Sequence, residues 1–133
     1  MSTLYLLDTN IASYIIRENM QVLRRLQANV SEKTAISVLT EAELMFGIER
    51  RPEAARLNAL VNRFLASNVI LEWTSTAAYH FARERAVLER KGQLLADIDM
   101  MIAAHALAED AVLVTNDAAF RRIDHLKVED WTD

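Results

Sequence analysis

The chain has 133 residues, enough for one domain over residues 1–133 with a substantial core, and no cysteine, which excludes disulfides and thiolate metal sites. Its net charge of −4 weighs against tight, sequence-independent binding of nucleic acid through excess Lys and Arg, but does not exclude a nucleic-acid substrate. The sequence has neither a signal-peptide pattern nor a membrane-spanning run, so we expect a cytoplasmic protein without membrane contact.

The first half of the chain alternates short apolar runs with helical patterns. Leu4–Leu7 predicts a strand that is buried on both faces, as strands of parallel sheets are. Thr9 or Asn10 suits the N-cap of the helix that follows, and Pro52 is expected to end one helix and start the next. The remaining predicted elements are helices over Ile11–Arg17, Val22–Val30, Thr40–Arg51 and Glu53–Ala66 and strands over Thr34–Val38 and Asn68–Trp73.

The second half continues the alternation. The predicted elements are helices from Ser75 or Thr76 to Arg90, over Asp97–Glu109 and from Asn116, and strands over Ala111–Thr115 and Lys127–Asp130. Gly92 stands where a helix C-terminal glycine belongs. The helix Asp97–Glu109 is expected to bury Ile98, Met101, Ile102 and Ala106. Strands separated by helices predict a three-layer α/β/α fold around a central, mainly parallel sheet of four to five strands.

Four acidic residues are predicted to meet at one edge of this sheet. Asp8 directly follows the first strand, and Asp117 lies just past the fourth. Glu43 is in the first turns of the helix after the second strand. Asp99 begins a helix that must run antiparallel to the fourth strand. Parallel topology therefore brings all four residues to the carboxyl edge, although strand order, which the sequence does not give, decides how close they come.

Each acid also has a structural explanation. Asp8 would cap the following helix, and Glu43 matches a capping box with Thr40, T-x-x-E before an apolar run. Asp99 would interact favourably with a helix dipole, and Asp117 would be a turn residue. For Asp8 a functional role is favoured, because a charge directly after a doubly buried strand is costly to place without use.

Together, the acids indicate a metal site. Crowded carboxylates raise one another's pKa unless a cation neutralises them, and oxygen ligands without Cys suit Mg²⁺ or Mn²⁺. Such an ion would polarise a phosphodiester and activate water. Four polar residues at strand ends are candidates to orient carboxylates or water, with helix capping as the competing role: Thr9, Asn10, Ser37 and Thr115.

Other polar and small residues are assigned structural roles, with one exception. Asp97, the rival of Asp99, is expected to be a helix N-cap, and Glu41, the rival of Glu43, lies on the other side of its helix from Gly47. Gly47 is the exception, because a glycine inside a helix suggests the close approach of another backbone or of substrate. The histidines are expected to be surface or half-buried, and the tryptophans to be packing residues: His80, His105, His125, Trp73 and Trp131.

These motifs resemble the PIN-domain family, specifically the VapC-like toxins of bacterial toxin–antitoxin pairs. The matching pieces are LLDTN at Leu6–Asn10, S-x-x-T-x-x-E-L-x-x-G at Ser37–Gly47, G-x-x-L-x-x-x-D-x-x-I-A-A-H-A at Gly92–Ala106 and LVTND-x-x-F at Leu113–Phe120. Their order and spacing agree along nearly the whole chain. One mild departure is Leu95-Ala96, where many relatives have Ile-Gly before the third acid.

The resemblance implies a PIN fold and an Mg²⁺- or Mn²⁺-dependent endoribonuclease that acts as a toxin on structured RNA such as tRNA or rRNA. It also implies inhibition by a cognate VapB-like antitoxin, and a homodimer. Asp8, Glu43 and Asp99 would form the acidic triad, and Asp117 would be the fourth acid. Five apolar residues of the early helices are expected either to belong to the core or, in part, to contact the second subunit or the antitoxin: Tyr14, Ile15, Leu23, Met45 and Phe46.

Three other functions compete with this one. A haloacid-dehalogenase-like phosphatase also begins with a strand ending in Asp, but needs a second Asp two residues later, where this chain has Asn10. A non-catalytic binding module on the same fold stays open, because fold does not fix function. A response-regulator receiver would need a lysine after a late strand, and none is suitably placed.

Overall fold

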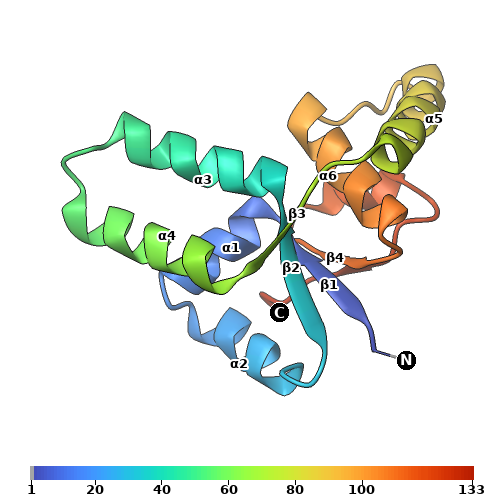
Figure 1. Ribbon diagram of the computed structural model, residues 1–133. Helices are drawn as coiled ribbons and strands as arrows, with labels where there is room; N and C mark the ends of the chain where they lie inside the picture. Colours follow the sequence, from blue (N-terminus) through green and yellow to red (C-terminus); the bar gives the residue numbers. More distant parts are fainter. Residues whose placement is uncertain (1) are drawn as a thin grey trace.

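The computed structural model describes residues 2–133, and a five-stranded parallel sheet lies at its centre (Figure 1). The strands are β1 (Leu4–Leu7), β2 (Lys33–Ser37), β3 (Val69–Leu71), β4 (Val112–Val114) and β5 (Val128–Glu129). Their order across the sheet is β3-β2-β1-β4-β5, and every neighbouring pair is parallel. The predicted mainly parallel sheet is therefore confirmed, with β1 at its middle.

Helices cover both faces of the sheet. They are α1 (Thr9–Ile16), α2 (Met20–Ala28), α3 (Val38–Arg50), α4 (Ala55–Ser67), α5 (Ser75–Lys91) and α6 (Asp97–Ala108), with a short 3₁₀ helix η1 (Ala118–Arg122). In Figure 1, α1 to α4 lie on one side of the sheet, and α5 and α6 lie on the other. None of the helices described is long and apolar enough to span a bilayer.

Alternating residues of the strands fill two separate cores, which explains the three layers. Tyr5 and Leu7 pack with Ile11 of α1 in one core, whereas Leu6 packs with Met100 of α6 in the other. Both faces of β1 are covered, so every residue from Tyr5 to Leu7 is buried. This confirms the burial that the continuous apolar run predicted. Both predicted packing roles of tryptophan hold: Trp131 is fully buried against Tyr5, and Trp73 packs edge-on against Phe81.

The strand order places a topological switch point beside β1. From β1 the chain moves to β2 and then β3 on one side, and later returns to β4 and β5 on the other. The backbone N–H of Asp8 donates to the carbonyl of Val114 at 3.0 Å, so the ends of β1 and β4 are joined. In open α/β sheets the crevice at such a point, outside the carboxyl ends of the strands, is where ligands bind.

The structure corrects several local predictions near helix starts. Helix α3 begins at Val38 with Ser37 as its N-cap, so the capping box of Thr40 with Glu43 is wrong. Helix α4 begins only at Ala55, and Pro52 lies in the turn before it. The N-cap of α6 is Ala96, so Asp97 is not the cap. In each case the cap depends on which backbone N–H groups the turn leaves free, which tertiary structure decides.

Two glycines behave differently. Gly92 ends α5 in the left-handed conformation, with φ of 66°, as predicted. Gly47 is exposed, and a Cβ built on it would meet no atom within 4 Å. The expected approach of another backbone to Gly47 is therefore wrong among the residues described.

The burial of α6 also differs from the pattern predicted for it. Ile98 is 42% exposed, and its neighbour Asp97 in the first turn of α6 is exposed as well, whereas Met100 is fully buried. His105 is fully buried as well, which corrects the prediction that all three histidines are surface or half-buried. Three fully buried alanines surround it in α6: Ala103, Ala104 and Ala106.

Candidate active site

Asp8 is a buried carboxylate at the centre of the carboxyl edge. Asp8 is the N-cap of α1, and its Oδ1 accepts a hydrogen bond from the Ile11 N–H at 2.9 Å. The residue is only 4% exposed. The pKa of Asp8 is raised to about 6, mainly by burial and also by the charges of Asp99 and Asp117. The Thr115 hydroxyl and the Ile11 N–H act in the opposite direction. Asp8 is thus both a helix cap and a buried carboxyl close to two other acidic side chains.

Asp99 connects the remaining acids electrostatically. It lies half-buried in the first turn of α6, and burial is the main cause that raises its pKa. The charges of Asp117 and then Glu43 raise the pKa of Asp99 further. Since Asp8 responds to Asp99 and Asp117, and Asp99 responds to Asp117 and Glu43, the four acids form one interacting group. We call Asp8, Glu43, Asp99 and Asp117 the acidic cluster.

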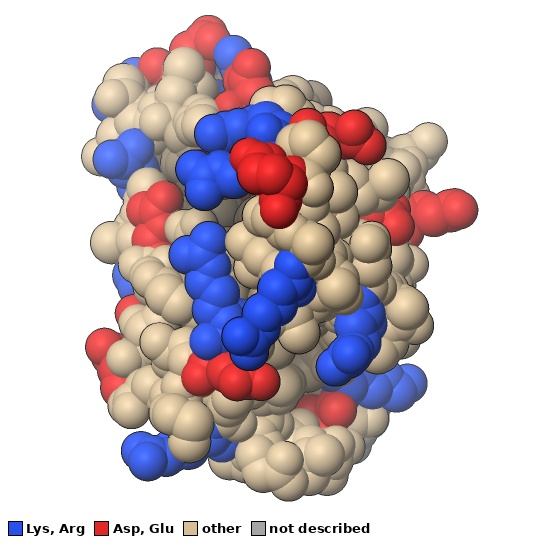
Figure 2. Space-filling view, turned by 90° about the vertical axis from the view of Figure 1, so that its left-hand side faces the viewer, with Lys and Arg blue, Asp and Glu red and all other residues tan. Residues whose placement is uncertain are grey.

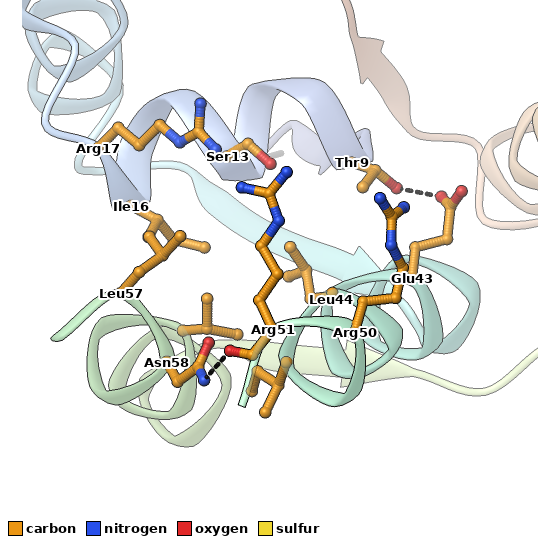
Figure 3. Close-up of a pocket in the computed structure, with 13 residues that line it drawn as sticks. Thr9, Ser13, Ile16, Arg17, Glu43, Leu44, Arg50, Arg51, Leu57 and Asn58 are labelled. Atoms are coloured by element: carbon orange, nitrogen blue, oxygen red, sulfur yellow. Dashed lines mark hydrogen bonds between the residues drawn. The ribbon is translucent and has the colours of Figure 1, made fainter. Parts of the chain in front are cut away.

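Glu43 is held by a hydroxyl from the neighbouring helix. The Thr9 hydroxyl donates to Glu43 Oε1 at 2.5 Å and lies 3.1 Å from the Thr40 hydroxyl (Figure 3). Thr9 is the first residue of α1, directly after Asp8, and Thr40 is buried in α3. This contact fixes the Glu43 carboxylate beside the end of β1.

Asp117 lies at the exposed side of the acidic cluster, beside the end of β4. Its Oδ1 accepts from the Ala119 N–H at 2.9 Å, so it caps η1. The Asp117 N–H donates to the Thr115 hydroxyl oxygen at 3.1 Å. Thr115 is buried, and its hydroxyl acts on Asp8 as well as on Asp117, which places it between the two acids.

The other two polar candidates lie away from the carboxylates. Asn10 is exposed on α1. The Ser37 hydroxyl accepts from the Leu39 N–H at 3.0 Å and lies 2.8 Å from His105 Nδ1, so it contacts no acid of the acidic cluster. Ser37 joins the start of α3 to the last turn of α6.

His105 is a residue that the sequence reasoning missed. Burial lowers the pKa of His105, against the influence of Glu109 and of the Glu72 backbone, and so favours the neutral imidazole. Its Nε2 has no hydrogen-bond partner among the residues described. The signal that could have found it is the run of alanines around His105, because small residues mark a helix that packs closely on several sides.

A pocket opens next to the acidic cluster. It has a volume of about 280 Å³ and lies between α1, α3 and α4 (Figure 3). Its polar lining includes Thr9, Glu43, Arg17, Arg50, Arg51 and Asn58. Leu44, Leu57 and Val61 close its inner side. The pocket therefore leads from an apolar wall past three arginines to the Glu43 carboxylate.

The acidic cluster fits a hard divalent cation by its chemistry. All its side-chain donors are carboxylate oxygens, and the charges of neighbouring acids add to burial in raising the pKa of Asp8 and of Asp99. Within residues 2–133, however, no three acidic or histidine side chains already stand in the arrangement of a metal site. The structure thus supplies the ligand types and their proximity, and no coordination geometry.

Comparison with protein families gives a match over most of the chain. The model of the PIN domain matches residues 5–126. Ribonuclease VapC2 of Haemophilus influenzae is 37% identical over 129 residues, which cover 96% of this chain and 97% of that protein. The tRNA(fMet)-specific endonuclease VapC of Salmonella typhimurium is 36% identical over 129 residues, with the same shares covered.

Solved structures agree with this match. VapBC2 from Rickettsia felis, bound to a DNA fragment from its promoter, contains a chain with a TM-score of 0.90 and 31% identity. That comparison covers 97% of this chain and 99% of the other. The DNA-bound VapBC of Salmonella typhimurium gives a TM-score of 0.88 and 34% identity over 98% and 99% of the two chains.

Proposed function

The chain belongs to the PIN-domain family, and from this premise we propose that it is the toxin of a toxin–antitoxin pair, an endoribonuclease that hydrolyses RNA phosphodiesters at the acidic cluster. The observation that carries the proposal is the interaction of four carboxylates at the switch point of the sheet. Asp8, Glu43 and Asp99 are assigned as catalytic residues, with Asp117 as the fourth.

The relatives support the substrate and the partner. Their names describe ribonucleases, and that of the Salmonella typhimurium relative specifies tRNA(fMet). We propose structured RNA, such as tRNA or rRNA, as the substrate class for this chain. Two neighbouring structures are VapBC complexes bound to DNA. A VapB-like antitoxin is accordingly the partner that inhibits this chain.

We propose Mg²⁺ or Mn²⁺ as the cofactor, held by the four carboxylates of the acidic cluster. When bound, such an ion polarises the phosphodiester and lowers the pKa of water at the site. The chain's own residues prepare the site: Thr9 holds the Glu43 carboxylate through its hydroxyl, and Thr115 contributes a hydroxyl between Asp8 and Asp117. The buried position of Asp8 excludes water from its inner side, which strengthens electrostatic interactions there.

Cleavage of bulk tRNA by the purified protein tests the proposal. We expect cleavage products with Mg²⁺ or Mn²⁺ and none with EDTA. In Asp8→Asn and Glu43→Gln the cleavage rate should fall about 100-fold or more. Glu41→Gln is the matched control, because Glu41 lies two residues from Glu43 on the same helix and is expected to leave cleavage unchanged. Hydrolysis of p-nitrophenyl phosphate without any cleavage of RNA would contradict the proposal and favour a phosphatase.

A further inference from the structure

Three arginines line the pocket beside Glu43. Arg50 is the last residue of α3, Arg51 is its C-cap, and Arg17 is the C-cap of α1. In Figure 3 the side chains of Arg50 and Arg51 extend from α3 toward α1, across the pocket from its apolar wall. Two separate elements thus bring positive charge to one opening, and we call Arg17, Arg50 and Arg51 the arginine wall.

The charges of the arginine wall are not used to hold the fold together. All three residues are exposed, and none forms an ion pair within the described part of the chain, whereas Arg25 and Arg85 do. Arg50 stacks over Phe46 at 5.5 Å, which leaves the edge of its guanidinium free to bind. Glu18 and Glu53 line the adjoining pocket together with Arg17, but neither forms an ion pair with an arginine of the arginine wall among the described residues.

The surrounding surface favours an extended anionic ligand. Figure 2 faces the side of α3 and α4 and shows several Lys and Arg side chains around the middle of this face, with Asp and Glu side chains beside them. Gly47 lines the same pocket and leaves it open, because a Cβ there would meet no atom within 4 Å. The Asn58 amide donates to the Arg51 carbonyl at 2.9 Å, which fixes the backbone that carries two of the arginines.

The acidic cluster creates a need for such a wall. A polyanion approaching four carboxylates is repelled, and the net charge of −4 gives no general attraction. Guanidinium groups bind phosphate oxygens in pairs, and their planar fork suits this better than an ammonium group does. Positive charge in the pocket that Glu43 lines therefore compensates the local repulsion along one path.

We propose that Arg17, Arg50 and Arg51 bind phosphates of the RNA strand next to the bond that is cleaved, so that the RNA enters the acidic cluster from the side of α1, α3 and α4. The inference rests on the proposed function and deepens it, since it assigns the binding side and the residues that make it. The arginine wall positions the substrate and takes no part in the bond-breaking step.

The salt dependence of RNA binding tests the arginine wall. Fluorescein-labelled bulk tRNA is titrated with protein in EDTA, where metal-dependent cleavage is absent, and binding is followed by anisotropy at several salt concentrations. For the variant R17A/R50A/R51A, we expect the slope of log Kobs against log salt to fall in magnitude by about two to three, and binding to weaken at least about tenfold. R17K/R50K/R51K is expected to keep most of the slope.

A second triple variant controls for net charge. Arg24, Arg63 and Arg90 are exposed, lie on α2, α4 and α5, and do not line this pocket. R24A/R63A/R90A removes the same charge and is expected to keep the wild-type slope. Equal losses in both triples would overturn the proposal, as would a wild-type slope in the pocket triple when circular dichroism shows both variants folded.

Two further outcomes separate this inference from its alternatives. If the pocket triple binds tRNA normally but loses affinity for poly-L-glutamate, the wall recognises an acidic peptide and the RNA proposal is overturned. If the wild-type protein cleaves no RNA with Mg²⁺ or Mn²⁺ while the pocket triple alone loses tRNA binding, the arginine wall stands and the proposed catalytic function fails.

Discussion

At the scale of single residues, the buried charge of Asp8, a proposed catalytic residue, lowers the stability of the fold. In the metal-free protein its folded-state pKa is about 6, against an ordinary value of 3.8, because burial disfavours the charged form. The folded state therefore binds the proton more tightly than the unfolded state. The resulting contribution to the free energy of unfolding is complete below about pH 4 and is lost as the pH rises through about 6.

Replacing Asp8 with Asn is expected to stabilise the metal-free protein. The Asn side chain can still accept from the Ile11 N–H but carries no charge, so the free energy of unfolding at pH 7.5 should rise by about 2–3 kcal/mol. Urea denaturation in EDTA at pH 7.5 and at pH 4.5 measures the difference, which should shrink at the lower pH. A wild-type protein more stable than Asp8→Asn at pH 7.5 would contradict the charge burial.

The hydroxyl of Thr9 offers a second residue-scale prediction. Thr9→Val keeps the shape but removes the donor to Glu43, so the carboxylate loses its fixed orientation. We expect kcat for tRNA cleavage to fall about 10–100-fold with the thermal midpoint changed little. Ser13→Ala is the control, because Ser13 lines the same pocket from the same helix. Unchanged kcat in Thr9→Val would show that Glu43 needs no such support.

At the scale of helices and strands, Ser37 links two elements that each carry an acid. It caps α3, the helix of Glu43, and contacts His105 in α6, the helix of Asp99. Ser37→Ala removes the cap and leaves buried His105 Nδ1 without its partner, so we expect a loss of about 2 kcal/mol in the free energy of unfolding. The measurement is urea denaturation at pH 7.5.

Ser67→Ala provides the comparison for Ser37→Ala. The Ser67 hydroxyl is at the exposed end of α4 and donates to backbone carbonyls of its own helix. Its replacement should change the free energy of unfolding by no more than about 0.5 kcal/mol. Similar losses in the two variants would mean that the contact between Ser37 and His105 adds nothing beyond an ordinary surface serine.

The type and order of the elements could be predicted from the sequence, whereas several helix starts could not. Apolar runs such as Leu4–Leu7 mark strands because both faces of the sheet are covered. Thr40 and Glu43 match a capping box in sequence, but Ser37, the last residue of β2, offers its hydroxyl earlier in the chain. Which of two competing caps is used depends on the turn that the sheet imposes.

At the scale of the whole molecule, strand order was the missing information. Parallel topology predicts that Asp8 and Asp117 share an edge, but only the pairing of β1 with β4 makes them neighbours. The contact between Ser37 and His105 also depends on how layers stack, and no local pattern reports it. The candidate acids could therefore be found from sequence, while their mutual influence and their support could not.

Exposed apolar residues on α3 lead to a prediction about association. Of the five residues expected at an interface, Met45 and Phe46 are 52% and 61% exposed, while Tyr14, Ile15 and Leu23 are half-buried. We propose a homodimer in which part of this apolar surface is covered, because exposed apolar clusters mark interaction sites. Light scattering at micromolar concentration should give twice the monomer mass, and Met45→Ser should lower it. A monomeric mass for the wild-type protein would contradict the dimer.

The central claim, that the acidic cluster cleaves RNA, is tested most directly by two variants of α6. Asp97 and Asp99 lie two residues apart, and Asp97 is exposed and pairs with Arg85, whereas Asp99 interacts with Glu43 and Asp117. With Mn²⁺, single-turnover cleavage of tRNA should fall about 100-fold or more in Asp99→Asn and stay near the wild-type rate in Asp97→Asn. Equal rates in the two variants, with both proteins folded, would contradict the account.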